Sequence, residues 1–165
     1  MKPQLMLAKR ATLEELQEYS QWMWERLFVE PKLDGVRFVR INGIWTSRQG
    51  KPFYNVDEIT KAIDSIKGIN KFLVDGELSG DDWSHTVSFA RSFRKKPTGE
   101  IRYKVFDLVH LDKPNIACRD RKELLAELFY KIRKNIHVVE SASVSSFEEF
   151  KIVFDEHVAS GCDGA

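Results

Sequence analysis

The chain has 165 residues, of which 42% are hydrophobic and 31% are charged, and its formal net charge is +1. This length suits one ordinary domain, and the composition is that of a soluble globular protein rather than a disordered one. No apolar run approaches the roughly 20 residues of a membrane helix, and the N-terminus is too weakly apolar for a signal peptide. Cys118 and Cys162 are far apart, which is typical of unpaired thiols in a reducing cytoplasm. Membrane proteins and disulfide frameworks are therefore excluded.

Apolar periodicity and turn signals predict alternating helices and strands. In chain order, the pattern predicts a helix over 13–26, strands over 28–30, 36–41 and 44–47, a helix over 57–67, strands over 71–78 and 101–111, a helix over 121–134, a strand over 136–140 and a helix over 145–160. Thr12 and Glu15 form a capping-box pattern at the first helix, and Asn42-Gly43 is a strong hairpin signal. Hairpin-linked strands with helices packed outside predict an α+β fold with mainly antiparallel sheets. Residues 161–165 read as a loop that enters another strand, so we expect a truncated domain.

Lys32 is the candidate nucleophile, in the stretch Lys32-Leu-Asp-Gly-Val-Arg37 between two predicted strands. A lysine amine attacks phosphorus only when it is unprotonated, which requires burial or a neighbouring cation such as Arg37. Gly35 lets the backbone come close to a ligand. A surface lysine on a hairpin edge is the alternative interpretation. No phosphate-binding glycine loop, serine nucleophile motif or metal-ligand spacing of histidines is present, so nucleophilic chemistry rests on Lys32.

Arg37 and Arg48 are predicted to face each other across the hairpin that turns at Asn42-Gly43. Like charges in such a pair are unfavourable unless an anion lies between them. Two guanidinium groups could therefore converge on a phosphate or on ribose oxygens, which arginine binds through two N–H groups. Two exposed cross-strand arginines are the alternative.

Carboxylates and one aromatic residue end or interrupt later strands. Asp75-Gly-Glu77 ends an apolar strand, where carboxylates can bind a ribose hydroxyl or Mg²⁺, although Asp-Gly is also a common turn. Phe106 lies in a buried-type strand and is either core or a ring that stacks on a nucleobase. Asp163, in the last loop, is a second candidate metal ligand.

A basic run extends from Arg91 to Lys104 and has one acidic residue, Glu100. Such a run is either a solvated surface or a patch that follows nucleic-acid phosphates. Arg91, Arg94, Lys95 and Lys96 are the basic residues at the start of this run.

Taken in order, these residues resemble the motifs of the covalent nucleotidyltransferase superfamily, and most closely those of compact phage-type ATP-dependent DNA ligases. Lys32-Leu-Asp-Gly-Val-Arg37 resembles the KxDGxR motif, and Ser47-Arg48-Gln-Gly50 resembles the motif that follows it. Asp75-Gly-Glu77 and Phe106 in YKVFDLVHL resemble two further motifs. Four motifs in this order cover nearly the whole chain.

The resemblance implies a covalent nucleotidyltransferase (ATP-grasp-like) fold and a role for each matched residue. Lys32 would take AMP from ATP as a phosphoramide, and AMP would then pass to the 5′-phosphate of a nick. The implied nucleotide contacts are Glu30 to the adenine amino group, Arg37 near the ribose and phosphate, Arg48 to the sugar and the 5′-phosphate of the nick, Glu77 to the ribose and metal, and Phe106 stacked on adenine. Asp163-Gly164 stands where the family usually has Glu-Gly, with Asp163 as a metal ligand.

The resemblance also implies ATP and Mg²⁺ (or Mn²⁺) as cofactors and nicked duplex DNA as the partner. The DNA contacts that it implies are Arg48, Arg91, Arg94, Lys95 and Lys96. We expect a cytoplasmic monomer that acts in DNA replication, repair or recombination, in a bacterial or phage-infected cell. Residues 1–165 would be a partial adenylation domain, which ends before the phosphate-contacting lysine motif and lacks the oligonucleotide-binding domain. RNA ligases and mRNA-capping guanylyltransferases share the lysine chemistry and stay open as alternatives, as does a non-catalytic nucleotide-binding fragment.

Overall fold

The computed structural model describes residue 5 and residues 9–93, 98–131, 135–162 and 164–165. The chain divides into two compact units, each with its own cluster of buried apolar side chains. The sheet unit comprises Gly35–Val138, and the terminal unit comprises Leu5–Asp34 together with Val139–Ala165. Among the described residues, no helix has the length and apolar character that crossing a membrane requires.

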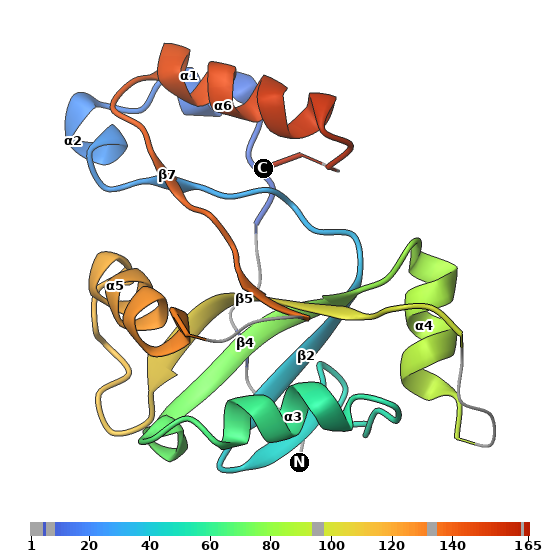
Figure 1. Ribbon diagram of the computed structural model, residues 1–165. Coiled ribbons are helices and arrows are strands. Elements are labelled where there is room, and N and C mark those ends of the chain that lie inside the picture. The colour runs from blue at the N-terminus through green and yellow to red at the C-terminus, as the bar shows by residue number, and fades with distance from the viewer. Residues whose placement is uncertain (1–4, 6–8, 94–97, 132–134, 163) are drawn as a thin grey trace. The chain divides into compact units, whose positions relative to one another are not determined.

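The sheet unit is built on five strands in the order β3-β2-β4-β5-β6 (Figure 1). The strands are β2 (Val36–Ile41), β3 (Ile44–Ser47), β4 (Phe72–Ser79), β5 (Arg102–His110) and β6 (Ile136–Val138). All neighbours are antiparallel except β5 and β6, which are parallel. A parallel pair needs a long crossover, and here the crossover contains α5 (Cys118–Phe129). The mainly antiparallel sheet that the sequence predicts is therefore confirmed.

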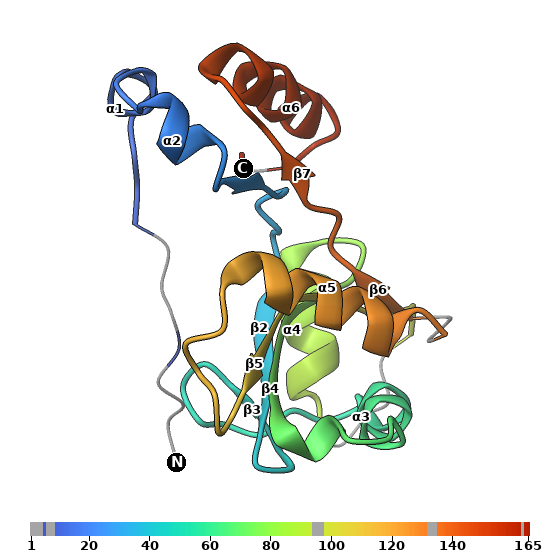
Figure 2. The same cartoon turned by 90° about the vertical axis from the view of Figure 1, so that its left-hand side faces the viewer.

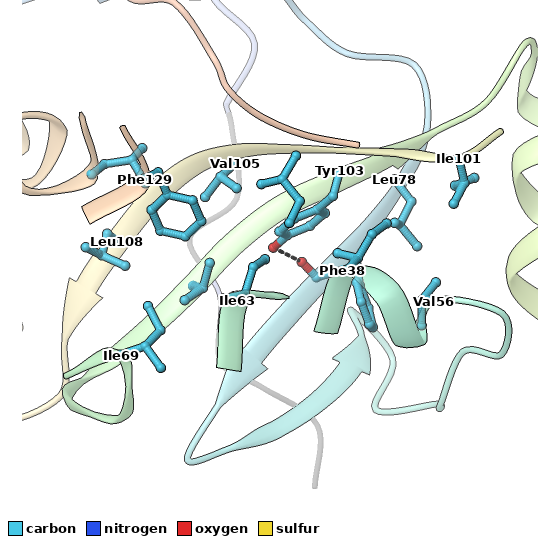
Figure 3. Close-up of a cluster of buried hydrophobic side chains, with 14 of the residues drawn as sticks. Phe38, Val56, Ile63, Ile69, Leu78, Ile101, Tyr103, Val105, Leu108 and Phe129 are labelled. Carbon is cyan, nitrogen blue, oxygen red and sulfur yellow. Dashed lines mark hydrogen bonds between the residues drawn. The ribbon is translucent and has the colours of Figure 1, made fainter. Parts of the chain in front are cut away.

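One face of this sheet is covered by helices. Figure 2 shows α3 (Asp57–Asp64) and α4 (Trp83–Arg91) on the same side of the strands, and a 3₁₀ helix η1 (Ile69–Lys71) leads into β4. The buried side chains between them, drawn in Figure 3, form the larger hydrophobic core. Tyr103 lies fully buried at its centre and donates its hydroxyl to the carbonyl oxygen of Phe38 at 2.8 Å (Figure 3). The hydrogen bond satisfies a polar group that would otherwise be costly to bury.

The terminal unit combines the first and last parts of the described chain. Its elements are α1 (Leu13–Gln17), α2 (Gln21–Trp24), β1 (Phe28–Val29), β7 (Ala142–Ser143) and α6 (Phe147–Ala159). β1 and β7 form a two-stranded antiparallel ribbon in which Phe28 pairs with Ser143 and Val29 with Ala142. Trp24 and Phe150 are buried together in the small core of this unit. Segments more than a hundred residues apart thus share one small core.

The continuous helix predicted over 13–26 is wrong. The capping box at Thr12 and Glu15 forms as expected, but α1 ends at Gln17 and α2 begins after Ser20. The backbone of Ser20 is extended, with ψ of 158°, so the two helical turns differ in direction. The break allows Leu16 and Trp24 to reach the same core, so tertiary packing overrides the local helical spacing.

The helix α4 was not predicted, because one of its three buried residues is the polar Thr86, which weakens the apolar periodicity of the segment. Asp82 caps it by accepting from the N–H of His85, and Thr86, Phe89 and Ala90 are buried at helical spacing. β7 was also missed, since two residues are too few for a periodic signal. The hairpin strands β2 and β3 begin and end where predicted, and the other elements differ by a few residues at their ends.

Candidate functional site

The face of the sheet opposite the helical core carries charged side chains, here called the charged face: Arg37, Asp75, Glu77, Lys104 and Asp107. The strand register explains this grouping. Arg37 pairs with Glu77 across β2 and β4, while Glu77 pairs with Lys104 across β4 and β5. Cross-strand partners share a face, and side chains alternate along each strand. Glu77 is therefore flanked by a basic residue on each neighbouring strand.

Gly76 explains why both carboxylates of Asp75-Gly-Glu77 reach the charged face. It lies inside β4 and not in a turn, so its neighbours on either side point away from the core. A Cβ at Gly76 would meet the Tyr103 ring and the carbonyl oxygen of Lys104, each at 2.6 Å. The glycine is thus required where the buried tyrosine crosses the strand.

Arg37 and Asp75 form a two-point ion pair. Nε of Arg37 donates to Oδ1 of Asp75 at 2.9 Å, and Nη2 donates to Oδ2 at 2.5 Å. Asp75 is only 5% exposed, and this burial raises its pKa, while the hydrogen bond from Arg37 acts in the opposite direction. The same hydrogen bond raises the pKa of Arg37. Arg37 therefore stays charged and held in place by a protein carboxylate.

A β-bulge in β5 adds Phe106 and Asp107 to this region. Asp75 pairs with Asp107 and Gly76 with Val105, so Phe106 is the extra residue of β5. The guanidinium carbon of Arg37 lies 5.4 Å from the centroid of the Phe106 ring. This contact is a cation–π interaction, and it fixes the aromatic ring beside the arginine.

Two side chains of α5 support the bulge. Arg121 donates to both oxygens of Asp107, at 2.8 and 3.2 Å, and to the carbonyl oxygen of Ile116 at 2.8 Å. Lys122 donates through Nζ to the carbonyl oxygen of Phe106 at 2.5 Å. Asp75 and Asp107 lie opposite each other, and each has its own arginine, which offsets the repulsion between the two carboxylates.

Arg48 lies in a tight turn after β3. The Oγ of Ser47, which is buried, accepts from the N–H groups of Gln49 and Lys51, at 3.3 and 3.0 Å. The N–H of Ser47 also donates to the carbonyl oxygen of Lys51 at 2.8 Å. The predicted hairpin register is confirmed, since Phe38 pairs with Ser47, one step inside Arg37 and Arg48. Asp75 is an anion that binds Arg37 here, while Arg48 is exposed.

Lys32 belongs to the terminal unit and follows β1. Its backbone N–H donates to the carbonyl oxygen of Gly164 at 2.8 Å, which joins the lysine segment to the last loop. The residue is exposed, so burial does not provide the desolvation that we expected from the sequence. Gly35 has a different role from the expected one. A Cβ there would meet the carbonyl oxygen of Leu78 at 2.1 Å, so the close approach is to β4.

Glu30 lies directly after β1. The hydroxyl of Ser141 donates to Oε1 of Glu30. Both residues belong to the terminal unit, and they continue the register of the β1–β7 ribbon, in which Val29 pairs with Ala142. The candidate adenine-reading carboxylate is therefore held by a residue 111 positions later in the chain.

The predicted site residues divide between the two units. Arg37, Glu77 and Phe106 gather on and beside the charged face, whereas Glu30 and Lys32 lie in the terminal unit. Of the DNA-contact candidates, Arg91 is the exposed last residue of α4 and Arg48 lies in its turn. The other three DNA-contact candidates lie outside the described residues: Arg94, Lys95 and Lys96. The candidate metal ligand Asp163 also lies outside them.

Several supporting residues could not be identified from the sequence: Asp75 as a partner of Arg37, together with Lys104, Arg121, Lys122 and Ser141. Their contacts join positions from 14 to 111 residues apart, and such separations leave no local pattern. One usable signal was the Asp-x-Glu spacing around Gly76, which places both carboxylates on one face of a strand.

A divalent metal fits this region only as an ion shared with substrate. Among the described residues, no three histidine, cysteine, aspartate or glutamate side chains gather in a way that could hold a metal ion. Mg²⁺ is usually bound by one or two carboxylates together with substrate phosphates and water. Glu77 on the charged face suits that mode of binding.

Comparison with known proteins identifies the family and the fold of the chain. A family model described as "ATP dependent DNA ligase domain" matches residues 5–165. No curated protein matches the sequence. Three similar solved structures are a Chlorella virus DNA ligase-adenylate, a Lig E DNA ligase and the ATP-dependent DNA ligase of bacteriophage T7 in complex with ATP.

The structural likeness covers most of this chain and about half of each solved protein. The Chlorella virus structure has a TM-score of 0.73 at 21% identity and matches 95% of this chain and 55% of its own. The Lig E structure has a TM-score of 0.72 at 20% identity and matches 99% of this chain and 60% of its own. The T7 structure has a TM-score of 0.60 at 17% identity and matches 86% of this chain and 56% of its own. The expected α+β nucleotidyltransferase fold is thereby confirmed.

Proposed function

We propose that this chain transfers an adenylyl group through a covalent lysine intermediate, because it belongs to the ATP-dependent DNA ligase domain family. The observation that carries the proposal is the family match over residues 5–165, which includes the stretch from Lys32 to Arg37. In the proposed reaction, the Lys32 ammonium group loses one proton to water, its neutral Nζ attacks the α-phosphorus of ATP, and Nζ loses a second proton to water as the new bond forms. A P–N bond forms, the bond to the bridging oxygen breaks, and pyrophosphate leaves.

The charged face supplies groups that suit a nucleotide. Arg37 presents a guanidinium group already oriented by Asp75, so little conformational entropy is lost when it meets a phosphate or ribose oxygen. The Phe106 ring, held beside Arg37, offers a surface for stacking on adenine. Glu77 would accept from a ribose hydroxyl. These assignments support recognition of ATP by positioning and charge neutralisation.

Glu77 is the described residue that we assign to Mg²⁺, with Asp163 as the second candidate from the sequence. The bound metal would neutralise charge on the phosphates and the leaving pyrophosphate. Arg37 and Lys104 lie across from Glu77 and keep the surroundings of this carboxylate positive. Positive surroundings favour binding of the ATP polyphosphate together with the metal ion.

Lys32 is exposed, so its activation depends on what binds over it. We propose that ATP itself excludes water from the amine, and that the hydrogen bond between Lys32 and Gly164 keeps the lysine backbone in one position. This assignment keeps Lys32 as the nucleophile although its side chain is exposed.

The test is intact-mass measurement after incubation with ATP and Mg²⁺. The expected result is a gain of one AMP that is absent in Lys32→Ala and in Lys32→Arg, which keeps the positive charge but removes the amine nucleophile. The matched control is Lys67→Ala, an exposed lysine of the sheet unit that should label like the unaltered chain. Labelling that persists in Lys32→Ala would contradict the proposal. Competition between ATP and GTP separates a ligase-type site from a capping-type one.

Sealing of nicks is proposed only for a protein in which these residues act with an oligonucleotide-binding domain. The chain spans 55–60% of the length of the three solved structures to which it is similar. In that protein, AMP would move from Lys32 to the 5′-phosphate of nicked DNA, and the 3′-hydroxyl would displace it. Residues 1–165 would form part of the adenylation domain.

A further inference from the structure

The contact between Glu30 and Ser141 is a cross-strand contact of the β1–β7 ribbon. Phe28 pairs with Ser143 and Val29 with Ala142, so the next antiparallel pair along the ribbon is Glu30 with Ser141. Opposite residues of such a ribbon point to the same side and lie within reach of each other. The Ser141 hydroxyl bonds to Oε1 of Glu30, and both side chains are partly buried.

We propose that Ser141 is a positioning residue that determines nucleobase specificity by holding Glu30 toward the 6-amino group of adenine. The inference rests on the proposed function, in which Glu30 reads that amino group. Ser141 does not touch the reacting phosphate, so its effect is on recognition of the base and not on the chemical step.

The direction of the hydrogen bond determines what Glu30 can recognise. An ionised carboxylate only accepts hydrogen bonds, so the serine hydroxyl must be the donor. A carboxylate has about four acceptor positions, so the bond to Ser141 leaves capacity for a further donor. Adenine presents an amino donor at position 6, whereas guanine presents a carbonyl acceptor there. A carboxylate held in one orientation therefore accepts from adenine and repels guanine.

Fixing the carboxylate also reduces the entropic cost of binding. A free glutamate side chain samples several rotamers, and ordering it costs free energy when the base arrives. Ser141 directly precedes β7 and orders Glu30 before ATP binds. Loss of the hydroxyl should weaken the interaction with the amino group while leaving the rest of nucleotide binding unchanged.

The experiment compares ATP with purine riboside triphosphate, which lacks only the 6-amino group. The rate of lysyl–nucleotide formation is measured against nucleotide concentration in single turnovers, for the unaltered chain and for Ser141→Ala. In Ser141→Ala, the half-saturating ATP concentration should rise about tenfold. This is the typical contribution of one hydrogen bond to a charged group, here the bond between Glu30 and the amino group of adenine. The half-saturating concentration of purine riboside triphosphate and the maximal rate with either nucleotide should stay unchanged.

Two variants separate specificity from folding. Ser141→Thr keeps a hydroxyl and should restore discrimination between the two nucleotides. Ser143→Ala, on the same strand opposite Phe28, should leave it unchanged. An equal rise in half-saturation for both nucleotides in Ser141→Ala would show a structural role and overturn the proposal, as would no change for either.

The outcome for Ser141 can be distinguished from the outcome for the proposed function. If the unaltered chain forms no adduct with ATP, covalent transfer fails, and Ser141 is then tested by equilibrium binding of the same two nucleotides. A selective loss of ATP affinity in Ser141→Ala supports the positioning role. Equal affinity of the unaltered chain for both nucleotides overturns it.

Discussion

Arg37 and Asp75 show how one pair of residues shapes the charged face. Asp75 is almost fully buried, and burial raises its pKa, so at neutral pH its charge is tolerated mainly because Arg37 donates two hydrogen bonds to it. A raised pKa in the folded state means that folding favours the protonated acid. This contribution to stability is present at acidic pH and is lost as the pH rises through the folded-state pKa.

Replacing Arg37 with Ala should therefore destabilise the chain in a pH-dependent way. At pH 7 the buried Asp75 carboxylate loses its partner, and the free energy of unfolding should fall by about 2–3 kcal/mol. At a pH of about 4.5 the decrease should be smaller, because Asp75 can bind a proton. Urea unfolding at both pH values measures the difference. The double variant Arg37→Ala/Asp75→Asn removes the buried charge and should recover stability at pH 7; failure to recover it would contradict this account.

The bulge in β5 shows how an element brings the predicted motifs together. It adds one residue against β4, so that Phe106 and Asp107 both lie near Arg37 and Asp75, and α5 holds it through Arg121 and Lys122. The sequence predicted β4 and β5 as strands, but a bulge depends on how two strands pair, and one strand's pattern does not encode it.

Gly76→Ala should disturb this element more than an ordinary glycine substitution. The added Cβ would meet the Tyr103 ring and the Lys104 carbonyl, both at 2.6 Å, so the ring must move and its hydroxyl would leave the carbonyl of Phe38. We expect the free energy of unfolding to fall by about 3 kcal/mol in urea titrations. The matched control is Gly68→Ala, whose Cβ meets no atom within 4 Å and which should cost only about 1 kcal/mol from its positive φ. Equal decreases in the free energy of unfolding for the two variants would show that the clash with Tyr103 does not contribute to the loss of stability.

At the scale of the whole molecule, charge is nearly balanced, with a formal net charge of +1. If the chain binds DNA as proposed, affinity for the phosphates is expected to come from local clusters rather than from the overall field. The sequence contains such a cluster in Arg91, Arg94, Lys95 and Lys96, and of these Arg91 is described as the exposed end of α4.

Replacing these four residues with Gln should weaken binding to nicked duplex DNA and reduce its dependence on salt. The slope of log affinity against log salt should decrease by about 0.9 for each phosphate that the variant no longer neutralises. The control replaces four exposed lysines with Gln: Lys61, Lys67, Lys71 and Lys113. Fluorescence anisotropy over a salt series measures both slopes. An equal decrease in the two variants would mean that overall charge, and not the run from Arg91, determines binding.

The sequence by itself determined the elements and motifs whose signals are local. The hairpin of β2 and β3 follows from Asn42-Gly43 and alternating residues, and the Lys32 to Arg37 stretch with three later motifs indicated the family. Local signals failed where packing decides: the helix over 13–26 breaks at Ser20 because Leu16 and Trp24 must reach one core.

The tertiary structure alone decided which side chains support the candidate residues. Asp75 holds Arg37, Arg121 holds Asp107 and Ser141 holds Glu30, across separations of 38, 14 and 111 residues. These contacts depend on strand register and on crossover helices, which follow from burial of apolar faces by segments distant in the chain. A sequence motif indicates which residue carries a function. The register of the neighbouring strands determines which side chains hold that residue in place.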